Sequence, residues 1–104
     1  MIYMLVNTVV APGKMNEFYD TAVKELMPLL PKIGMKSVAS FRAFTGDMNQ
    51  TYTIYAFDDL AAYQKSREAQ RNSPEYQKVS AKLNAFRVSQ TQTLLEPNTW
   101  SPMK

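Results

Sequence analysis

The first stretch of the chain, Ile2–Val10, has apolar side chains at both alternating sets of positions. Side chains of a strand point alternately to the two faces of a sheet, so a strand with one solvated face would show only one apolar set. Polar Asn7 and Thr8 interrupt the run without restoring such an alternation. We therefore predict a β-strand over Ile2–Val10 that is buried on both faces, and Pro12 and Gly13 should end it.

Apolar residues at helical spacing follow the first strand. Gly13 can act as the N-cap of a helix over Lys14–Met27. Because Pro28 lacks a backbone N–H and its ring clashes one turn back, the helix should end or bend there. Gly34 is predicted to stop the helical course of the chain. The positions that define this spacing are Met15, Phe18, Ala22, Leu26, Leu29 and Ile33.

Two segments rich in β-branched and aromatic residues come next, at Lys36–Thr45 and Gln50–Phe57. Such residues are enriched in strands, and the connection between the two segments is short. We therefore predict that they pair as an antiparallel hairpin. Asp58 or Asp59 should then cap the next helix, because a carboxylate accepts hydrogen bonds from the first free backbone N–H groups.

The second helical region is predicted in two pieces. The run Ser73-Pro74-Glu75 signals a new helix start, since Ser is a good N-cap, Pro is tolerated at the first helical position and an acid suits the first turn. Helical spacing continues to Phe86. The last predicted strand, Arg87–Leu95, has an unusually polar middle.

This order predicts an α+β fold of the ferredoxin-like type, a β-α-β-β-α-β sandwich with a split second helix. Right-handed crossovers place both helical regions on one face of the sheet. The other face would expose apolar strand residues, which is unusual for a soluble monomer. We therefore expect a homodimer in which two sheets face each other as a dimeric α/β barrel. Residues 1–97 form the predicted domain, and residues 98–104, which include Trp100, form a C-terminal arm or tail.

The composition limits the chemistry. The 104 residues suffice for one domain, and the chain contains neither histidine nor cysteine. Zinc and haem sites therefore lack their usual protein ligands, and neither a Ser-His-Asp nor a Cys-His nucleophile system can be built. We expect no cofactor. Any acid–base chemistry would use Asp, Glu, Lys, Tyr or bound water.

Charge and hydropathy bear on partners and location. The net charge is +3, and no basic stripe with interleaved aromatic residues stands out, so we expect no nucleic-acid partner. No apolar run reaches about 18 residues, so we expect no membrane partner. The first residues lack the basic region and cleavage site of a signal peptide. We therefore expect a cytoplasmic protein, and the absence of cysteine is compatible with that compartment.

Polar or amphipathic side chains on the apolar strands are the candidate ligand-binding residues. An arginine offers a fork of donors to an anionic or carbonyl-bearing ligand. The two candidate tyrosines lie on opposite strand faces, so one should pack beneath the helices and the other should face the dimer cavity. Alternatively, these polar groups satisfy one another across the dimer interface. The candidates are Asn7, Arg42, Tyr52, Tyr55, Gln90 and Gln92, and no catalytic residue is predicted. Arg67, on a helix surface, is expected to form an ion pair with an acid.

Several short motifs share their order and spacing with one known family. They are Val10-Ala-Pro12-Gly13-Lys14 followed by Phe18, Gly46-Asp-Met-Asn49, Tyr55-Ala-Phe57-Asp-Asp-Leu60-Ala61, Arg67 with Ser73-Pro74-Glu75-Tyr76-Gln77, and Leu94-Leu95-Glu-Pro97. Together they resemble the NIPSNAP family, part of the dimeric α/β-barrel group of ferredoxin-like domains. The chain departs from the family pattern at Val6 and Thr8, where an Arg and a Tyr are common, and these departures remove two polar groups from the first strand.

The resemblance implies a fold rather than one activity, because related barrels include cofactor-free monooxygenases, haem-degrading enzymes and stress-responsive proteins. The first hypothesis is a protein that binds or transforms a small apolar or aromatic molecule without a metal cofactor. The alternative is a non-catalytic protein-interaction or stress-related module that uses the dimer surface or the arm around Trp100. A third hypothesis is a barrel that binds haem. The absence of histidine disfavours it, although tyrosine can ligate haem.

Overall fold

The elements follow one another in the predicted order in a computed structural model that describes residues 1–104. This order confirms the ferredoxin-like β-α-β-β-α-β fold with a split second helix. The first helical region has three consecutive parts and the second has two. The bounds are β1 Ile2–Val10, α1 Met15–Thr21, η1 Ala22–Leu26, η2 Met27–Ile33, β2 Lys36–Arg42, β3 Gln50–Phe57, α2 Leu60–Arg71, α3 Pro74–Asn84 and β4 Arg87–Leu95.

The first helical region changes its winding twice. The α-helical part α1 is followed by the π-helical η1 and then by the 3-10 helix η2, which contains Pro28 in its first turn. Because this proline cannot donate a backbone hydrogen bond, a regular α-helix cannot run through it, and the predicted bend at Pro28 is confirmed. The predicted α-helical span Lys14–Met27 is wrong, and so is the cap at Gly13, because Lys14 is the N-cap. Gly34 ends η2 in the left-handed conformation, with φ 70°, as predicted.

Side-chain caps define both pieces of the second helical region. The Asp59 carboxylate accepts a 2.8 Å hydrogen bond from the backbone N–H of Ala62 at the start of α2. The Ser73 hydroxyl accepts a 3.1 Å hydrogen bond from the backbone N–H of Tyr76 at the start of α3. Each cap satisfies a backbone donor that the first helical turn leaves free. Both predicted helix starts are therefore confirmed.

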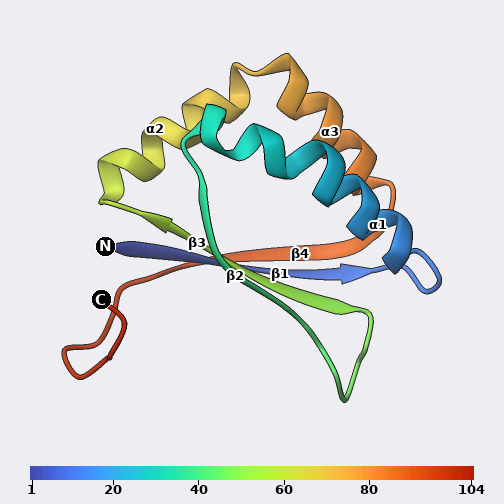
Figure 1. Cartoon of the computed structure of the whole chain (residues 1–104), viewed down its shortest axis with the longest axis horizontal. Coiled ribbons are helices and arrows are strands. Elements are labelled where there is room, and N and C mark those ends of the chain that lie inside the picture. The colour runs from blue at the N-terminus through green and yellow to red at the C-terminus, as the bar shows by residue number, and fades with distance from the viewer.

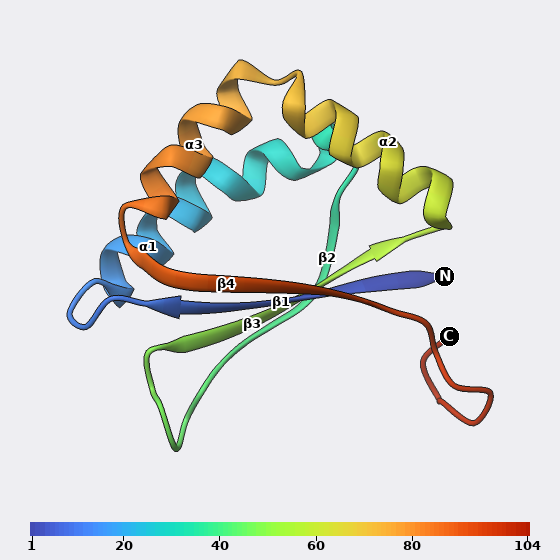
Figure 2. The ribbon, with the colours of Figure 1, turned by 180° about the vertical axis from the view of Figure 1, so that it is seen from behind.

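All the helices lie on one face of a four-stranded antiparallel sheet, whose strand order is β2-β3-β1-β4 (Figures 1 and 2). Alternate residues of β1 from Met4 to Val10 are buried beneath the helices. The buried apolar residues form two clusters, one around Met4 and Phe57 and the other around Val10 and Phe18. None of the helices has the length and apolar character needed to cross a membrane.

Two irregularities in strand pairing change which residues face the helices. In β4, Ser89 pairs with Val9 but Arg87 pairs with Val10, so Val88 is an extra residue. In β2, the register likewise shifts between Ser37 and Ala39. A β-bulge of this kind breaks the strict alternation of side chains. Arg87 therefore shares the helix-covered face with buried Val10 instead of pointing to the opposite face.

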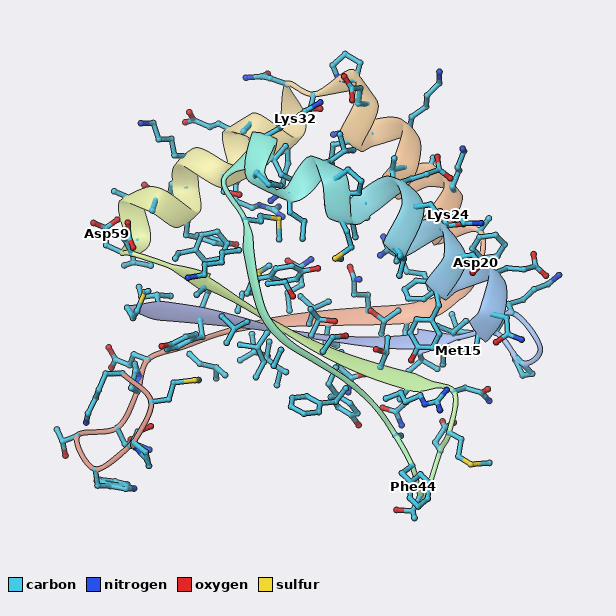
Figure 3. The ribbon with its side chains drawn as sticks, viewed as in Figure 1. Met15, Asp20, Lys24, Lys32, Phe44 and Asp59 are labelled. Atoms are coloured by element: carbon cyan, nitrogen blue, oxygen red, sulfur yellow. The ribbon has the colours of Figure 1, made fainter.

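No element of the chain covers the middle of the opposite sheet face (Figures 1 and 2). Tyr3 lies on this face and is buried because residues 98–104 fold against it, with the Tyr3 hydroxyl donating a 2.7 Å hydrogen bond to the Lys104 carbonyl oxygen. The β2–β3 connection projects beyond the sheet, with the exposed Phe44 at its tip (Figure 3). Strand β2 ends at Arg42, so the predicted strand Lys36–Thr45 is too long.

Candidate ligand-binding pocket

A pocket of about 470 Å³ lies between the sheet and the helices, and all four strands contribute to its floor. This volume is within the usual range of small-molecule sites. Figure 3 shows many side chains reaching into the space between the two layers. The pocket adjoins both buried clusters, since Met4 and Tyr55 from one cluster and Phe18 and Leu83 from the other line it.

One wall of the pocket is apolar. It consists of side chains from α1, η1 and η2, and its outermost members are largely exposed, with Val23 64% and Met27 37% accessible to solvent. Exposed aliphatic residues that also line a pocket mark where the pocket meets solvent. The residues of this wall include Phe18, Ala22, Val23, Leu26, Met27 and Leu30.

The opposite wall is basic. Arg67 and Arg71 from α2 and Arg87 from β4 line it, whereas no Asp, Glu or Lys lines any part of the pocket. The ion pairs of the chain join Lys14 to Glu17 and Lys82 to Glu25, so no arginine is paired with an acid. The prediction that Arg67 forms an ion pair is therefore wrong.

Two tyrosines place hydroxyl groups between these walls, Tyr55 from the floor and Tyr76 from α3. Burial raises the pKa of Tyr55 to about 12, and the nearby Tyr76 phenol adds to the rise. Burial also raises the pKa of Tyr76, although the Arg87 and Arg67 guanidinium groups act in the opposite direction. Burial lowers the pKa of Arg87, and Tyr76 opposes that change. Both phenols therefore keep their protons at neutral pH and can donate hydrogen bonds beside fixed positive charge.

The floor of the pocket carries a band of amides and hydroxyls. The Gln90 side-chain amide donates a 3.1 Å hydrogen bond to the Thr8 hydroxyl, and the Gln92 amide donates a 3.4 Å bond to the Gln90 carbonyl oxygen. A 3.2 Å bond joins the hydroxyls of Ser40 and Thr53. The first and third of these bonds connect neighbouring strands and the second lies within β4, so the floor holds its polar groups in place without a partner from outside the chain.

Buried polar contacts fix the helices above this floor. The Ser66 hydroxyl donates a 2.6 Å hydrogen bond to the Ile33 carbonyl oxygen, which ties α2 to the end of η2. The Gln70 side-chain amide contacts the Met35 sulfur at 3.4 Å, and Gln77 donates a 2.9 Å bond to the Gln70 carbonyl oxygen. Because Ser66 and Gln70 are buried, these bonds are shielded from water and set the position of the basic wall.

The six predicted ligand-binding residues are divided between the two faces of the sheet. Tyr55, Gln90 and Gln92 line the pocket. Asn7 and Tyr52 lie on the opposite face, where both donate hydrogen bonds to the Gln50 side-chain carbonyl oxygen, at 3.3 and 3.1 Å. The predicted opposite orientation of the two tyrosines is therefore confirmed. Ligand binding by any of these residues stays a prediction.

Arg42 belongs to neither group. It is the last residue of β2, and it pairs with Thr51 at the exposed edge of the sheet. Its side chain is exposed and does not line the pocket. An arginine at such a position remains hydrated, so it has less to gain from binding an anion than an arginine in a partly buried pocket.

The basic wall was missed by the reasoning from sequence. Arg67 and Arg71 are four residues apart, so they share one helix face. That repeat of like charge was an available signal for the α2 half of the wall. Arg87 had no such signal, because strict alternation along β4 assigns it to the wrong face and only the β-bulge turns it toward the pocket.

Comparisons with known proteins agree with this fold. The model of the NIPSNAP family matches residues 4–102. An uncharacterised NIPSNAP domain protein from Burkholderia xenovorans superposes with a TM-score of 0.90 at 19% identity, covering 98% of this chain and 99% of its own. A NIPSNAP family protein from Agrobacterium tumefaciens gives a TM-score of 0.91 at 18% identity, with coverages of 99% and 98%.

A more distant similarity links the fold to another group. A protein from Nitrosomonas europaea that is proposed to be an antibiotic biosynthesis monooxygenase gives a TM-score of 0.71 at 9% identity, covering 93% of this chain and 98% of its own. Identities this low support a common fold and carry no residue roles. Among curated proteins, none matches the sequence significantly.

Proposed function

The chain belongs to the NIPSNAP family, and we propose that it binds a small molecule with an apolar body and one anionic group in the pocket between its sheet and its helices. The observation that carries this proposal is the charge of the lining: three arginines and no acid, opposite an apolar wall. Like charges that converge in a partly buried site repel one another, and a bound anion relieves that repulsion.

The donor set suits an oxyanion. Each guanidinium group presents a planar fork of N–H donors, which matches the oxygens of a carboxylate, sulfonate or phosphate. The protonated hydroxyls of Tyr55 and Tyr76 add donors with no positive charge of their own. Charge-assisted hydrogen bonds of this kind contribute about 1.5–3 kcal/mol each.

The apolar wall suits the body of the same ligand. Aliphatic and aromatic side chains from α1, η1 and η2 face the basic wall across the pocket, so an alkyl or aromatic group can lie against them while the anion reaches the arginines. Because the chain has neither histidine nor cysteine, the proposal involves no metal.

Two probes with the same alkyl chain and opposite charge test this proposal by titration calorimetry. Each probe is kept below the concentration at which it forms micelles. We expect dodecanoate to bind and dodecyltrimethylammonium to bind at least about tenfold more weakly. Arg87→Gln should weaken dodecanoate binding about tenfold, which corresponds to one lost charge-assisted hydrogen bond. Arg42→Gln is the matched control, because it removes the same charge outside the pocket. Equal affinity for the two probes, or equal effects of the two substitutions, would contradict the proposal.

A second copy of the chain is the proposed partner. The uncovered sheet face carries Leu5, Ile54 and Phe41, of which Phe41 is 60% exposed. Two such faces packed together would bury on the order of 2,000 Å² in total, the size of a stable interface. Sedimentation at micromolar concentration tests this homodimer, and a folded monomer under those conditions would contradict it.

A further inference from the structure

A second hollow adjoins the basic wall on the outside of α2. It measures about 430 Å³ and is lined by Tyr63, Gln64, Arg67, Glu68 and Arg71. Residues three and four apart on a helix share a face, which explains why positions 64, 67, 68 and 71 occur together. Arg67 and Arg71 also line the inner pocket, so the same two side chains separate the two hollows and belong to both.

The lining changes in a definite order from inside to outside. The apolar wall comes first, the arginines next, and beyond them Glu68, the one acid that lines either hollow. Neither ion pair of the chain involves Glu68, so its carboxylate is free to attract a cation. Tyr63 lines the same hollow, and its ring makes a T-shaped contact with Phe57 at a centroid distance of 5.4 Å.

An anion held by Arg67 and Arg71 therefore lies between two spaces that can both be filled. A terminal carboxylate would use only the inner space. A phosphodiester keeps a single negative charge while it carries substituents on both sides, so it can extend into both hollows at once. A small cationic group on its outer side would meet the exposed carboxylate of Glu68, which attracts it as in a surface ion pair.

We propose that the ligand is a single-chain amphiphile with an internal phosphodiester, whose alkyl chain fills the inner pocket and whose small cationic head lies against Glu68 and Tyr63. This inference rests on the proposed function, since it assumes that the inner pocket binds an apolar body and the arginines bind an anion. It adds the position of the anion within the ligand and a role for the outer hollow.

Three probes separate the parts of this ligand: dodecylphosphocholine, dodecanoate with the same chain but a terminal anion, and phosphocholine with the head alone. We expect dodecylphosphocholine, kept below its micelle-forming concentration, to bind more tightly than dodecanoate. Phosphocholine alone should bind at least about a hundredfold more weakly than dodecylphosphocholine, because each buried methylene contributes about fourfold in affinity.

Glu68→Gln distinguishes the outer hollow from the inner pocket. This substitution should weaken dodecylphosphocholine binding by about threefold to fivefold, the upper range for an exposed charge pair, and should leave dodecanoate binding no weaker. Asp20→Asn is the matched control, since it removes an exposed acid on α1 that lines neither hollow and should change neither affinity. Thermal melting of each variant verifies that the fold is intact.

The outcomes separate this inference from the proposed function. If dodecanoate binds as tightly as dodecylphosphocholine, or if Glu68→Gln has no effect on the latter, the internal phosphodiester is wrong while the anionic pocket stands. If phosphocholine alone binds as tightly as dodecylphosphocholine, the site recognises only a head group and the inference is also wrong. If neither alkyl probe binds, the proposed function fails together with the inference.

Discussion

The two faces of the sheet use similar strands in opposite ways. On the helix-covered face, Met4 and Tyr55 are buried, yet the helices stand far enough from the floor to leave a pocket of about 470 Å³. On the open face, the neighbouring residues Leu5 and Ile54 remain only partly buried, and residues 98–104 cover no more than the end near Tyr3. The helices of the same chain cover one face and leave a pocket above it, whereas no element covers the middle of the other face.

The polar groups of the two faces differ in the same way. On the open face, Asn7 and Tyr52 both bond to Gln50, so these groups satisfy one another within the chain. On the covered face, the arginines have no acid partner and converge on a space large enough for a ligand. The unmatched charge, more than polarity itself, therefore distinguishes a candidate binding face from a candidate interface.

The largest expected effect comes from placing a charge at the centre of the open face. Ile54→Asp should convert the proposed dimer to a monomer, weakening association by more than about a thousandfold, or about 4 kcal/mol, because the carboxylate would be buried without a partner. Sedimentation velocity measures the change. Leu60→Asp, at an exposed position on α2, is the control and should leave the dimer intact. A dimer that survives Ile54→Asp would mean that the open face is not the interface.

Truncating adjacent residues on opposite faces separates folding from association. Met4→Ala should lower the free energy of unfolding by about 2–5 kcal/mol at any protein concentration, because Met4 is 3% exposed in the core of the single chain. Leu5→Ala should instead act mainly on the dimer dissociation constant. Chemical denaturation at several protein concentrations measures both effects. The comparison fails if Leu5→Ala destabilises the dissociated chain as much as Met4→Ala does.

The smallest expected effect is a loss of stability at alkaline pH. The pKa of Tyr55 rises from 10.0 to about 12 on folding, so its contribution to stability is complete below pH 10 and is lost as the pH rises through 12. This loss amounts to about 2–3 kcal/mol in the wild-type protein. Tyr55→Phe should abolish this loss of stability at high pH. Tyr52→Phe, on the open face, leaves Tyr55 in place, so the loss should persist in that variant. Equal pH profiles for the wild type and Tyr55→Phe would refute the assignment.

Local signals predicted most of the fold. The strand at Ile2–Val10, the helix starts at Asp59 and Ser73 and the stop at Gly34 each depend on residues close in sequence, and each agrees with the structure. Burial of this strand on both faces stays a prediction, because it depends on the proposed partner. In the first helical region, the break was predicted from the sequence but the change of winding before it was not. Pro28 marked the break, but the π-helical turns of η1 that precede it have no local signal that we can identify.

The sequence by itself determined the order of the elements and the alternation that separates Tyr52 from Tyr55, because backbone propensity, capping and strand periodicity act over a few residues. Only the tertiary structure decided where the charge converges. Arg87 reaches the basic wall because a β-bulge shifts its register against β1, and Arg67 joins it because Ser66 and Gln70 anchor α2 above the sheet. Such placements depend on contacts between distant segments, which no local pattern in the chain encodes.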